Sequence, residues 1–319
     1  MSVLRCAVLD DYQGVSLEYA DWSRLGDSVE VTVFREHLDG EDAVAEALTE
    51  FEIVVVMRER TPLTATLINR LPKLRLVVTS GMRNASIDRA AAAARGVVVC
   101  GTRSASQPPA ELTWALILGL ARGLVTENSA LRAGGPWQQT VGTDLAGATL
   151  GLLGLGKIGT QVARVGLAFG MDVVAWSPRL TADRAAAAGV RLAPDKRSLF
   201  AEADFVSLHL VLAETTRGIV GAEELDAMKP TAYLVNTSRA GLVDTPALVA
   251  ALRERRIAGA GLDVYDVEPL PADDPFRALP NVLATPHLGY VSRRNYRGYF
   301  TEAVEDIAAF LAGERVRVL

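Results

Sequence analysis

Residues 149–170 read TLGLLGLGKIGTQVARVGLAFG, and this stretch decides the fold of the chain. Gly154, Gly156 and Gly159 form the pattern GxGxxG directly after a β-rich run and directly before a helical one. In such a pattern the first glycine permits a tight turn, the second lets backbone approach a pyrophosphate, and the third allows close packing of helix on strand. Backbone N–H groups at the start of the helix then attract phosphate. The segment predicts a dinucleotide-binding unit whose phosphate loop contains Gly154, Gly156, Lys157, Ile158 and Gly159.

Strand-like and helix-like runs alternate on both sides of this loop. Before it, the predicted strands are Leu4–Leu9, Val29–Phe34, Ile53–Met57, Leu74–Thr79 and Val97–Cys100. From it onward, they are Thr149–Leu153, Asp172–Trp176, Phe205–Leu208, Ala232–Asn236 and Gly259–Val264. This alternation is typical of parallel sheets with helices on both faces. The sequence predicts an α/β fold class with two doubly wound parallel-sheet domains, joined by an apolar segment over residues 109–132 and followed by an amphipathic C-terminal helix over Arg293–Leu319.

The composition excludes several classes of protein. Of 319 residues, 50% are hydrophobic and 22% are charged, and the net charge of -5 argues against a nucleic-acid surface. The longest apolar run, Leu112–Ala121, is too short to cross a bilayer. Cys6 and Cys100 lie in strand-like runs without a CxxC partner, so both are predicted to be reduced core residues. The scattered histidines predict no metal site. We expect a cytoplasmic protein with no nucleic-acid and no membrane partner.

The position that selects between NAD and NADP lies about 20 residues beyond the glycine loop, at the end of the second strand. NAD enzymes carry Asp or Glu there to bond the ribose 2′-hydroxyl. This chain has Ser177, Pro178 and Arg179 instead, so no carboxylate repels a 2′-phosphate and Arg179 can pair with one. A solvated loop arginine is the alternative interpretation. The sequence favours NADP, or use of both dinucleotides.

Three segments in the last third of the chain carry polar residues just past predicted strands: LVNTSRAGLVD (234–244), AGLDVYDVEPLP (260–271) and LATPHLGY (283–290). The carboxyl ends of strands in an α/β sheet are where ligands bind. Arg239 can hold a carboxylate bidentately and polarise a keto oxygen. His287 can give a proton to the alkoxide that forms as a hydride arrives, while Glu268 orients the imidazole and keeps its acid form available near neutral pH. A 2-oxo acid reductase needs this set of groups.

With these segments in view, the chain resembles the D-isomer-specific 2-hydroxyacid dehydrogenase family over nearly its whole length. The matching motifs occur in the family's order and are LLGLGKIG, HLVLAETTRGIVG, MKPTAYLVNTSRAG, GLDVYDVEPLP and ATPHLG. The resemblance implies a flavodoxin-like substrate domain of residues 1–103 plus 292–319 and a Rossmann NAD(P)-binding domain of residues 104–291. It also implies a cleft that closes, and a homodimer built around the connecting segment.

The resemblance further implies roles for individual residues. Arg239, Glu268 and His287 take the catalytic roles in moving a hydride between NAD(P)H and C2 of a small 2-oxo acid or D-2-hydroxy acid, and Arg239 and His287 contact both substrate and cofactor. Asp263 would bond the nicotinamide carboxamide. Other residues expected to line the cofactor are Leu210, Thr237, Ser238 and Gly289. His209 is interpreted as structural or cofactor-lining, not as an acid.

The substrate loop of the first domain departs from the family. The family pattern is close to GxGxDNID, and this chain has GMRNASID over residues 81–88. The family binds the substrate carboxylate through backbone N–H groups of this loop, here those of Met82 and Arg83. Because Arg83 replaces a glycine, one hypothesis is that it recognises a second anionic group on the substrate, together with Arg58 or Arg60. A solvated or internally paired arginine is the alternative.

Two smaller departures lie beside the predicted site. Ala240 stands where the family has glycine after the catalytic arginine, which suggests a different turn, and Val211 stands where the family often has proline. The particular 2-hydroxy acid therefore stays open.

Several other interpretations compete with a 2-hydroxyacid dehydrogenase. Taken singly, Arg239, Glu268 and His287 can be a surface arginine, a turn carboxylate and a loop histidine. Their occurrence together, after a dinucleotide-binding loop, favours a catalytic site. Formate-oxidising relatives usually have glutamine at the position of Glu268, which counts against that reaction. Phosphite oxidation stays open on the motifs. A dinucleotide-sensing binding protein, like the corepressors of this fold, also stays open, although such proteins usually carry long extensions. A lyase or isomerase with permanently bound NAD is the weakest of these.

Overall fold

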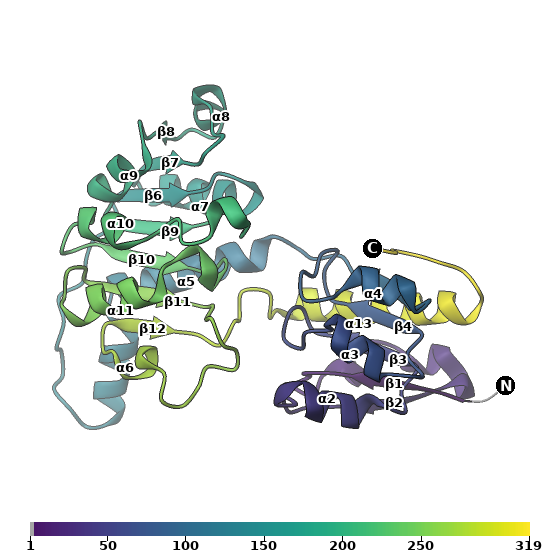
Figure 1. The fold of residues 1–319 in the computed structure, drawn as a ribbon. Helices are drawn as coiled ribbons and strands as arrows, with labels where there is room; N and C mark the ends of the chain where they lie inside the picture. Colours follow the sequence, from purple (N-terminus) through teal and green to yellow (C-terminus); the bar gives the residue numbers. More distant parts are fainter. Residues whose placement is uncertain (1–2) are drawn as a thin grey trace. The chain divides into compact units, whose positions relative to one another are not determined.

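The computed structural model describes residues 3–319, which form two compact units (Figure 1). Unit 1 contains the residues up to Ala105 together with Ser292–Leu319, and unit 2 contains Ser106–Val291. The chain therefore leaves unit 1 once and returns to it once. Each unit has its own parallel sheet, as the alternation of strand-like and helix-like runs predicts.

Unit 1 is built on a five-stranded parallel sheet with the strand order β2-β1-β3-β4-β5. The strands are β1 (Leu4–Val8), β2 (Val29–Val33), β3 (Ile53–Val56), β4 (Leu76–Thr79) and β5 (Val98–Gly101). The helices are α1 (Ser16–Tyr19), η1 (Trp22–Ser28), α2 (Gly40–Leu48), α3 (Ala65–Arg70), α4 (Arg89–Ala94) and α13 (Arg293–Leu311). This strand order is the flavodoxin-like one, and it confirms the predicted fold class.

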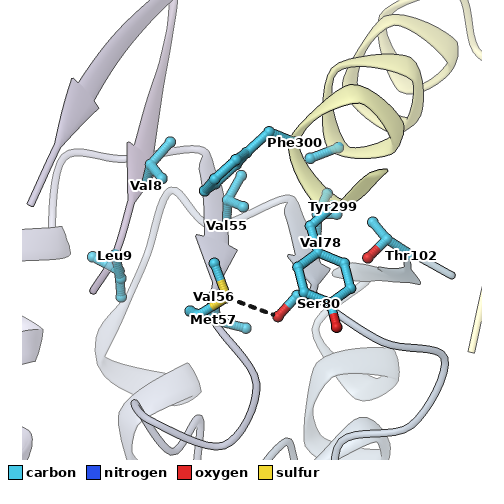
Figure 2. A pocket seen from close by; sticks show the side chains of 11 residues that line it. Val8, Leu9, Val55, Val56, Met57, Val78, Ser80, Thr102, Tyr299 and Phe300 are labelled. Carbon is cyan, nitrogen blue, oxygen red and sulfur yellow. Dashed lines mark hydrogen bonds between the residues drawn. The ribbon is translucent and has the colours of Figure 1, made fainter. Parts of the chain in front are cut away.

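The C-terminal helix α13 packs on the sheet of unit 1, far in sequence from the strands that it covers (Figure 1). Figure 2 shows Tyr299 and Phe300 of this helix around a cavity that Val8, Val55 and Val78 of the strands also line. The central strands β3 (IVVV) and β4 (LVVT) are fully buried, almost continuous apolar runs because both faces of the sheet are covered there. Residues separated by two hundred positions thus share one core.

The prediction of a helix over the whole of Arg293–Leu319 is wrong at its end. The helix stops at Leu311, and Gly313 has φ +79°, a left-handed conformation that glycine adopts without steric cost. The final residues then run alongside β5: Gly101 N donates to Arg317 O at 3.0 Å, and Leu319 N donates to Val99 O at 2.9 Å. The open edge of the sheet offers unpaired backbone groups, and the tail satisfies them.

A buried carboxylate in α13 is paired with this tail. Arg317 Nε donates to Asp306 Oδ1 at 2.9 Å, while Asp306 Oδ2 has no hydrogen-bond partner among the described residues. Burial raises the pKa of Asp306 to about 6, although Arg317 opposes the shift; the nearby Glu302 and Glu305 add to it. A pKa above the ordinary value means that the folded protein holds this proton more tightly than the unfolded chain does.

The stability of the protein should therefore depend on the protonation of Asp306. The raised pKa stabilises the fold below about pH 4, and this contribution is lost as the pH rises through about 6, which amounts to about 3 kcal/mol. We expect the free energy of unfolding of Asp306→Asn, relative to the unsubstituted protein, to rise by up to that amount between about pH 4 and about pH 7. Thermal unfolding in a calorimeter at several pH values measures it. A difference between the two proteins that is constant with pH would contradict the expectation.

Unit 2 is built on a seven-stranded parallel sheet with the order β12-β11-β10-β9-β6-β7-β8. The strands are β6 (Thr149–Leu153), β7 (Asp172–Trp176), β8 (Arg191–Leu192), β9 (Phe205–Leu208), β10 (Tyr233–Asn236), β11 (Gly259–Leu262) and β12 (Val282–Ala284). The helical segments are α5 (Gln107–Ala121), α6 (Leu124–Arg132), α7 (Lys157–Ala168), α8 (Ala182–Ala187), α9 (Lys196–Glu202), η2 (Glu214–Thr216), α10 (Ala222–Ala227), η3 (Ala240–Leu242), α11 (Thr245–Arg253) and α12 (Pro275–Ala278). The order reverses beside β6, and ligands bind at such a switch point.

Both cysteines lie in the core of unit 1. Cys6 is 0% and Cys100 2% exposed, and both thiols are free. Burial raises the pKa of the Cys100 thiol to about 11, so it stays protonated near neutral pH. Among residues 3–319, none of the helices is both long enough and apolar enough to span a membrane.

Candidate active site

The glycine loop joins β6 to α7 in the arrangement that GxGxxG predicts. Gly154 has φ +110°, and a Cβ there would lie 2.8 Å from the backbone carbonyl of His209. A Cβ on Gly159 would collide with the carbonyl oxygen of Gly154. Gly156 differs, because a Cβ there meets nothing within 4 Å. The first and third glycines are therefore required by the protein's own packing, whereas the second faces open space at the N-terminus of a twelve-residue helix.

The loop after β7 carries the residues predicted to choose the dinucleotide. Ser177 is partly buried, and Pro178 and Arg179 are exposed. Arg184 is not among the residues predicted from the sequence, and its Nη1 donates to the backbone oxygen of Arg179 at 3.4 Å. Residues 177–182 contain no carboxylate, whereas the first turn of α8 contains Asp183 beside Arg184.

His287 and Glu268 form a hydrogen-bonded pair. His287 Nδ1 lies 2.6 Å from Glu268 Oε2, and the two side chains keep 18% and 26% of their surface exposed. The other carboxylate oxygen of Glu268 accepts from the backbone N–H of Tyr265 at 2.9 Å. His287 has φ +51°, and its ring meets that of Tyr290 edge-on at 5.2 Å. With Nδ1 engaged, Nε2 is the nitrogen left to exchange a proton with a ligand.

Asp263 holds the loop that carries His287. Its carboxylate is fully buried and accepts from Thr285 Oγ1 at 2.6 Å, from Leu288 N at 2.7 Å and from Gly289 N at 2.8 Å. Burial raises the pKa of Asp263, and these bonds and the nearby His287 oppose the rise. All of these contacts are within the protein, so a bond from Asp263 to a nicotinamide carboxamide stays a prediction.

The segment after β10 places the predicted arginine at the same edge of the sheet. Asn236 orders this turn: its Oδ1 accepts from Ser238 N at 3.0 Å and its Nδ2 donates to Arg239 O at 3.0 Å. The hydroxyl of Ser238 donates to Leu210 O at 2.7 Å, and that of Thr237 lies 2.7 Å from Thr113 Oγ1. The Arg239 guanidinium is partly buried, and Nη1 donates to Ser238 O at 2.7 Å.

The sheet order brings these residues to one edge of unit 2. Strands β12, β11, β10, β9 and β6 are consecutive neighbours and all parallel, so the loops after them meet at their carboxyl ends. His287 follows β12, Glu268 follows β11 and Arg239 follows β10. The glycine loop follows β6 at the same edge.

His209 lies behind the glycine loop, at the end of β9. Its Nε2 is 2.9 Å from Ser207 Oγ, and desolvation of the imidazole lowers the pKa of His209 to about 4. The ring is therefore neutral near pH 7 and does not serve as an acid. The interpretation of His209 as structural or cofactor-lining fits this environment.

The predicted substrate loop lies in unit 1, after β4. Gly81 has φ +94°, and its N–H donates to Thr102 Oγ1 at 3.1 Å. Met82 is 42% exposed and Arg83 is also exposed. Asn84 closes the loop by donating to Arg58 O at 2.6 Å and Thr79 Oγ1 at 2.9 Å.

The three arginines that the sequence groups together have different surroundings in unit 1. Arg58 Nη1 donates to Ser80 O at 3.4 Å, and Arg60 Nη1 donates to Asp10 O at 2.8 Å while stacking on Tyr12 at 4.4 Å. No hydrogen bond or ion pair engages the side chain of Arg83 among residues 3–319. Arg83 is therefore the most available of the three for an external anion.

Comparison with known proteins gives concordant matches. Residues 114–289 match the model of the NAD binding domain of D-isomer specific 2-hydroxyacid dehydrogenases. The chain is 37% identical over 286 residues to D-3-phosphoglycerate dehydrogenase of Methanocaldococcus jannaschii, covering 86% of this chain and 54% of that protein. It is 38% identical over 259 residues to glyoxylate reductase of Aeropyrum pernix, covering 78% and 76%. A phosphoglycerate oxidoreductase structure from Vibrio cholerae superposes with a TM-score of 0.92 at 40% identity, covering 98% of this chain and 100% of that one. The match thus spans about half the length of the first relative.

Proposed function

Because this chain belongs to the D-isomer specific 2-hydroxyacid dehydrogenase family, we propose that it moves a hydride between a nicotinamide dinucleotide and C2 of a small 2-oxo acid or D-2-hydroxy acid. The observation that carries the proposal is the 2.6 Å bond between His287 and Glu268, at the same sheet edge as Arg239 and the glycine loop. In this assignment unit 2 binds the dinucleotide, and the loop of Met82 and Arg83 in unit 1 supplies backbone N–H groups for the substrate carboxylate.

The residues of unit 2 can divide the reaction between them. The bound dinucleotide supplies the hydride that reduces C2 of the oxo acid. Arg239 binds the substrate carboxylate and draws electron density toward the keto oxygen, which becomes an alkoxide as C2 gains the hydride. His287 donates the Nε2 proton to that oxygen, giving the hydroxyl group, and Glu268 stabilises the ring in the orientation that this transfer needs. Oxidation of the hydroxy acid uses the same groups in reverse.

An assembly into a homodimer is part of this proposal. Apolar side chains that would be costly to leave in water gather on α6 and the segment after it: Leu124, Val125, Leu131, Trp137 and Val141. Trp137 is 79% exposed and Val141 100%. A second copy of the chain covering this segment accounts for them, and the resemblance implies an interface at this place.

Turnover of a panel of 2-oxo acids tests the proposal. Oxidation of NADH and of NADPH is followed with glyoxylate, hydroxypyruvate, its 3-phosphate, pyruvate, phenylpyruvate and oxaloacetate. Reduction of any member supports the reaction class, and preference for an acid with a second anionic group supports a substrate role for Arg83. No turnover with any member, in a protein that binds the dinucleotide tightly, contradicts it and favours phosphite oxidation or a dinucleotide sensor.

The choice of dinucleotide is tested at the end of β7. We propose use of NADPH, alone or beside NADH, because Arg179 and Arg184 can pair with a 2′-phosphate and no carboxylate stands at residues 177–179. Ser177→Asp should lower kcat/KM for NADPH about tenfold or more while retaining turnover with NADH, since it places a negative charge beside that phosphate. Steady-state kinetics with both dinucleotides measures the ratio. Ser28→Asp, the same change at an exposed position of unit 1, is the control, and an unchanged ratio in Ser177→Asp would contradict the assignment.

A further inference from the structure

One tyrosine contacts both Glu268 and the turn that leads into His287. Tyr265 lies three residues after β11, and its backbone N–H donates to Glu268 Oε1 at 2.9 Å. Its hydroxyl lies 3.0 Å from Leu262 O and 3.0 Å from Thr285 O. The same residue therefore holds the carboxylate through its main chain and the histidine loop through its side chain.

The two carbonyls mark the point at which neighbouring strands separate. Leu262 is the last residue of β11, and Thr285 directly follows β12. Thr285 N donates to Leu262 O at 2.8 Å, the last such bond before the loops diverge. Thr285 O also accepts from His287 N at 3.0 Å. The Tyr265 hydroxyl is thus hydrogen-bonded to the carbonyl of Thr285, which begins the turn that leads into His287.

His287 needs such support because its backbone is in a costly conformation. At φ +51° a residue with a Cβ is strained, and surrounding bonds must hold it there. Leu288 N and Gly289 N are held by Asp263 on the far side of His287. On the near side, the corresponding anchor is Thr285, which the hydroxyl of Tyr265 and the carboxylate of Asp263 both engage.

The Tyr265 hydroxyl is buried, so it contacts the backbone oxygens of Leu262 and Thr285 and not a ligand. Tyr265 is 9% exposed, and its ring packs against Phe276 with 6.3 Å between centroids. Burial raises the pKa of Tyr265, so the hydroxyl keeps its proton and remains a donor throughout the working range of pH. Removing it leaves the carbonyls of Leu262 and Thr285 with one donor fewer in a buried place.

We propose that Tyr265 is a positioning residue that sets the geometry of the Glu268–His287 pair, by fixing the carboxylate with its N–H and the histidine turn with its hydroxyl. The inference rests on the proposed function for its kinetic consequence, but the hydrogen bond between Glu268 and His287 exists whatever the substrate is. Its test therefore includes a readout that needs no turnover.

Tyr265→Phe in the full chain is the test, with Tyr233→Phe as the matched control. Tyr233 opens β10 at the opposite end of the same sheet and stacks on Phe205, so the control removes a hydroxyl from unit 2 away from the pair. The first readout is the downfield proton resonance of a hydrogen-bonded imidazole N–H in protein with labelled histidine. The chain has three histidines, and the His287 signal is assigned by its loss in His287→Gln. The second readout is kcat and KM.

We expect Tyr265→Phe to broaden or shift the His287 resonance and to lower kcat about tenfold, because small displacements of reacting groups are costly. The dinucleotide Kd and the His37 resonance should stay as in the unsubstituted protein, and Tyr233→Phe should change none of these. An unchanged His287 resonance in Tyr265→Phe overturns the inference. Loss of dinucleotide binding along with the resonance also overturns it, because the hydroxyl would then serve the fold of unit 2 in general. If no 2-oxo acid is reduced, the proposed function fails, and the resonance still decides the role of Tyr265.

Discussion

Replacing His287 with glutamine should lower kcat for 2-oxo acid reduction by about a thousandfold, within the range that removal of a general acid costs. Glutamine keeps a polar side chain of similar reach, so hydrogen bonding in the loop is partly preserved. It has no proton to give at neutral pH, and water must then protonate the alkoxide. Dinucleotide binding should persist, because the glycine loop lies on a different strand of the sheet. Steady-state kinetics and calorimetric titration with the dinucleotide measure the two effects.

His37→Gln serves as the control for this substitution. His37 Nδ1 lies 3.1 Å from Asp10 Oδ1 in unit 1, so it also forms an imidazole–carboxylate pair, but no sequence or structural argument assigns it to the reaction. We expect its kcat to stay within about twofold of the unsubstituted protein. A His287→Gln protein that kept most of its kcat/KM would contradict the acid role.

Two alanine substitutions in the glycine loop should affect different properties: one the binding of the dinucleotide and the other the stability of unit 2. Gly156→Ala should leave thermal stability unchanged, because a Cβ meets nothing within 4 Å and the φ of -89° suits alanine. It should weaken dinucleotide binding about a hundredfold or more, because the second glycine of this pattern leaves room for the pyrophosphate. Gly159→Ala should destabilise unit 2 by about 2 kcal/mol or more, because its Cβ collides with Gly154 O.

Comparing Gly156→Ala with Gly159→Ala distinguishes a glycine that leaves room for the ligand from one that the packing of the protein requires. In an ordinary helix, alanine in place of glycine stabilises by about 1 kcal/mol, so a loss of stability in Gly159→Ala has to come from the collision. Thermal unfolding without ligand and titration with NADH and NADPH provide both measurements. A Gly156→Ala protein that binds either dinucleotide as tightly as the unsubstituted protein would contradict the assignment of this loop to the pyrophosphate.

Local sequence determined most of the strands because buried parallel strands are short, continuous apolar runs. Thr149–Leu153, Asp172–Trp176 and Phe205–Leu208 have the same bounds in prediction and structure. Strand β8 is absent from the prediction because its two residues are exposed and form no apolar run. The tail after Leu311 is wrongly predicted as helix because its pairing partner, β5, lies two hundred residues away and local periodicity contains no trace of it.

For the candidate site, the sequence by itself predicted an arginine, a carboxylate and a histidine. It placed each of them just after a strand and later in the chain than the glycine loop. Their catalytic roles remain predictions. Tertiary structure alone decided that β10, β11 and β12 are neighbours, which places His287 Nδ1 2.6 Å from Glu268 Oε2. It alone decided that Tyr265 contacts both Glu268 and Thr285 O in the turn that leads into His287. It also separated Arg83, whose side chain is exposed, from Arg58 and Arg60, which bond to backbone oxygens. The sequence alone shows which residues follow a strand and can lie in the turn after it. Which side chains then contact each other depends on strand order and backbone conformation, and both are determined by residues far away in the sequence.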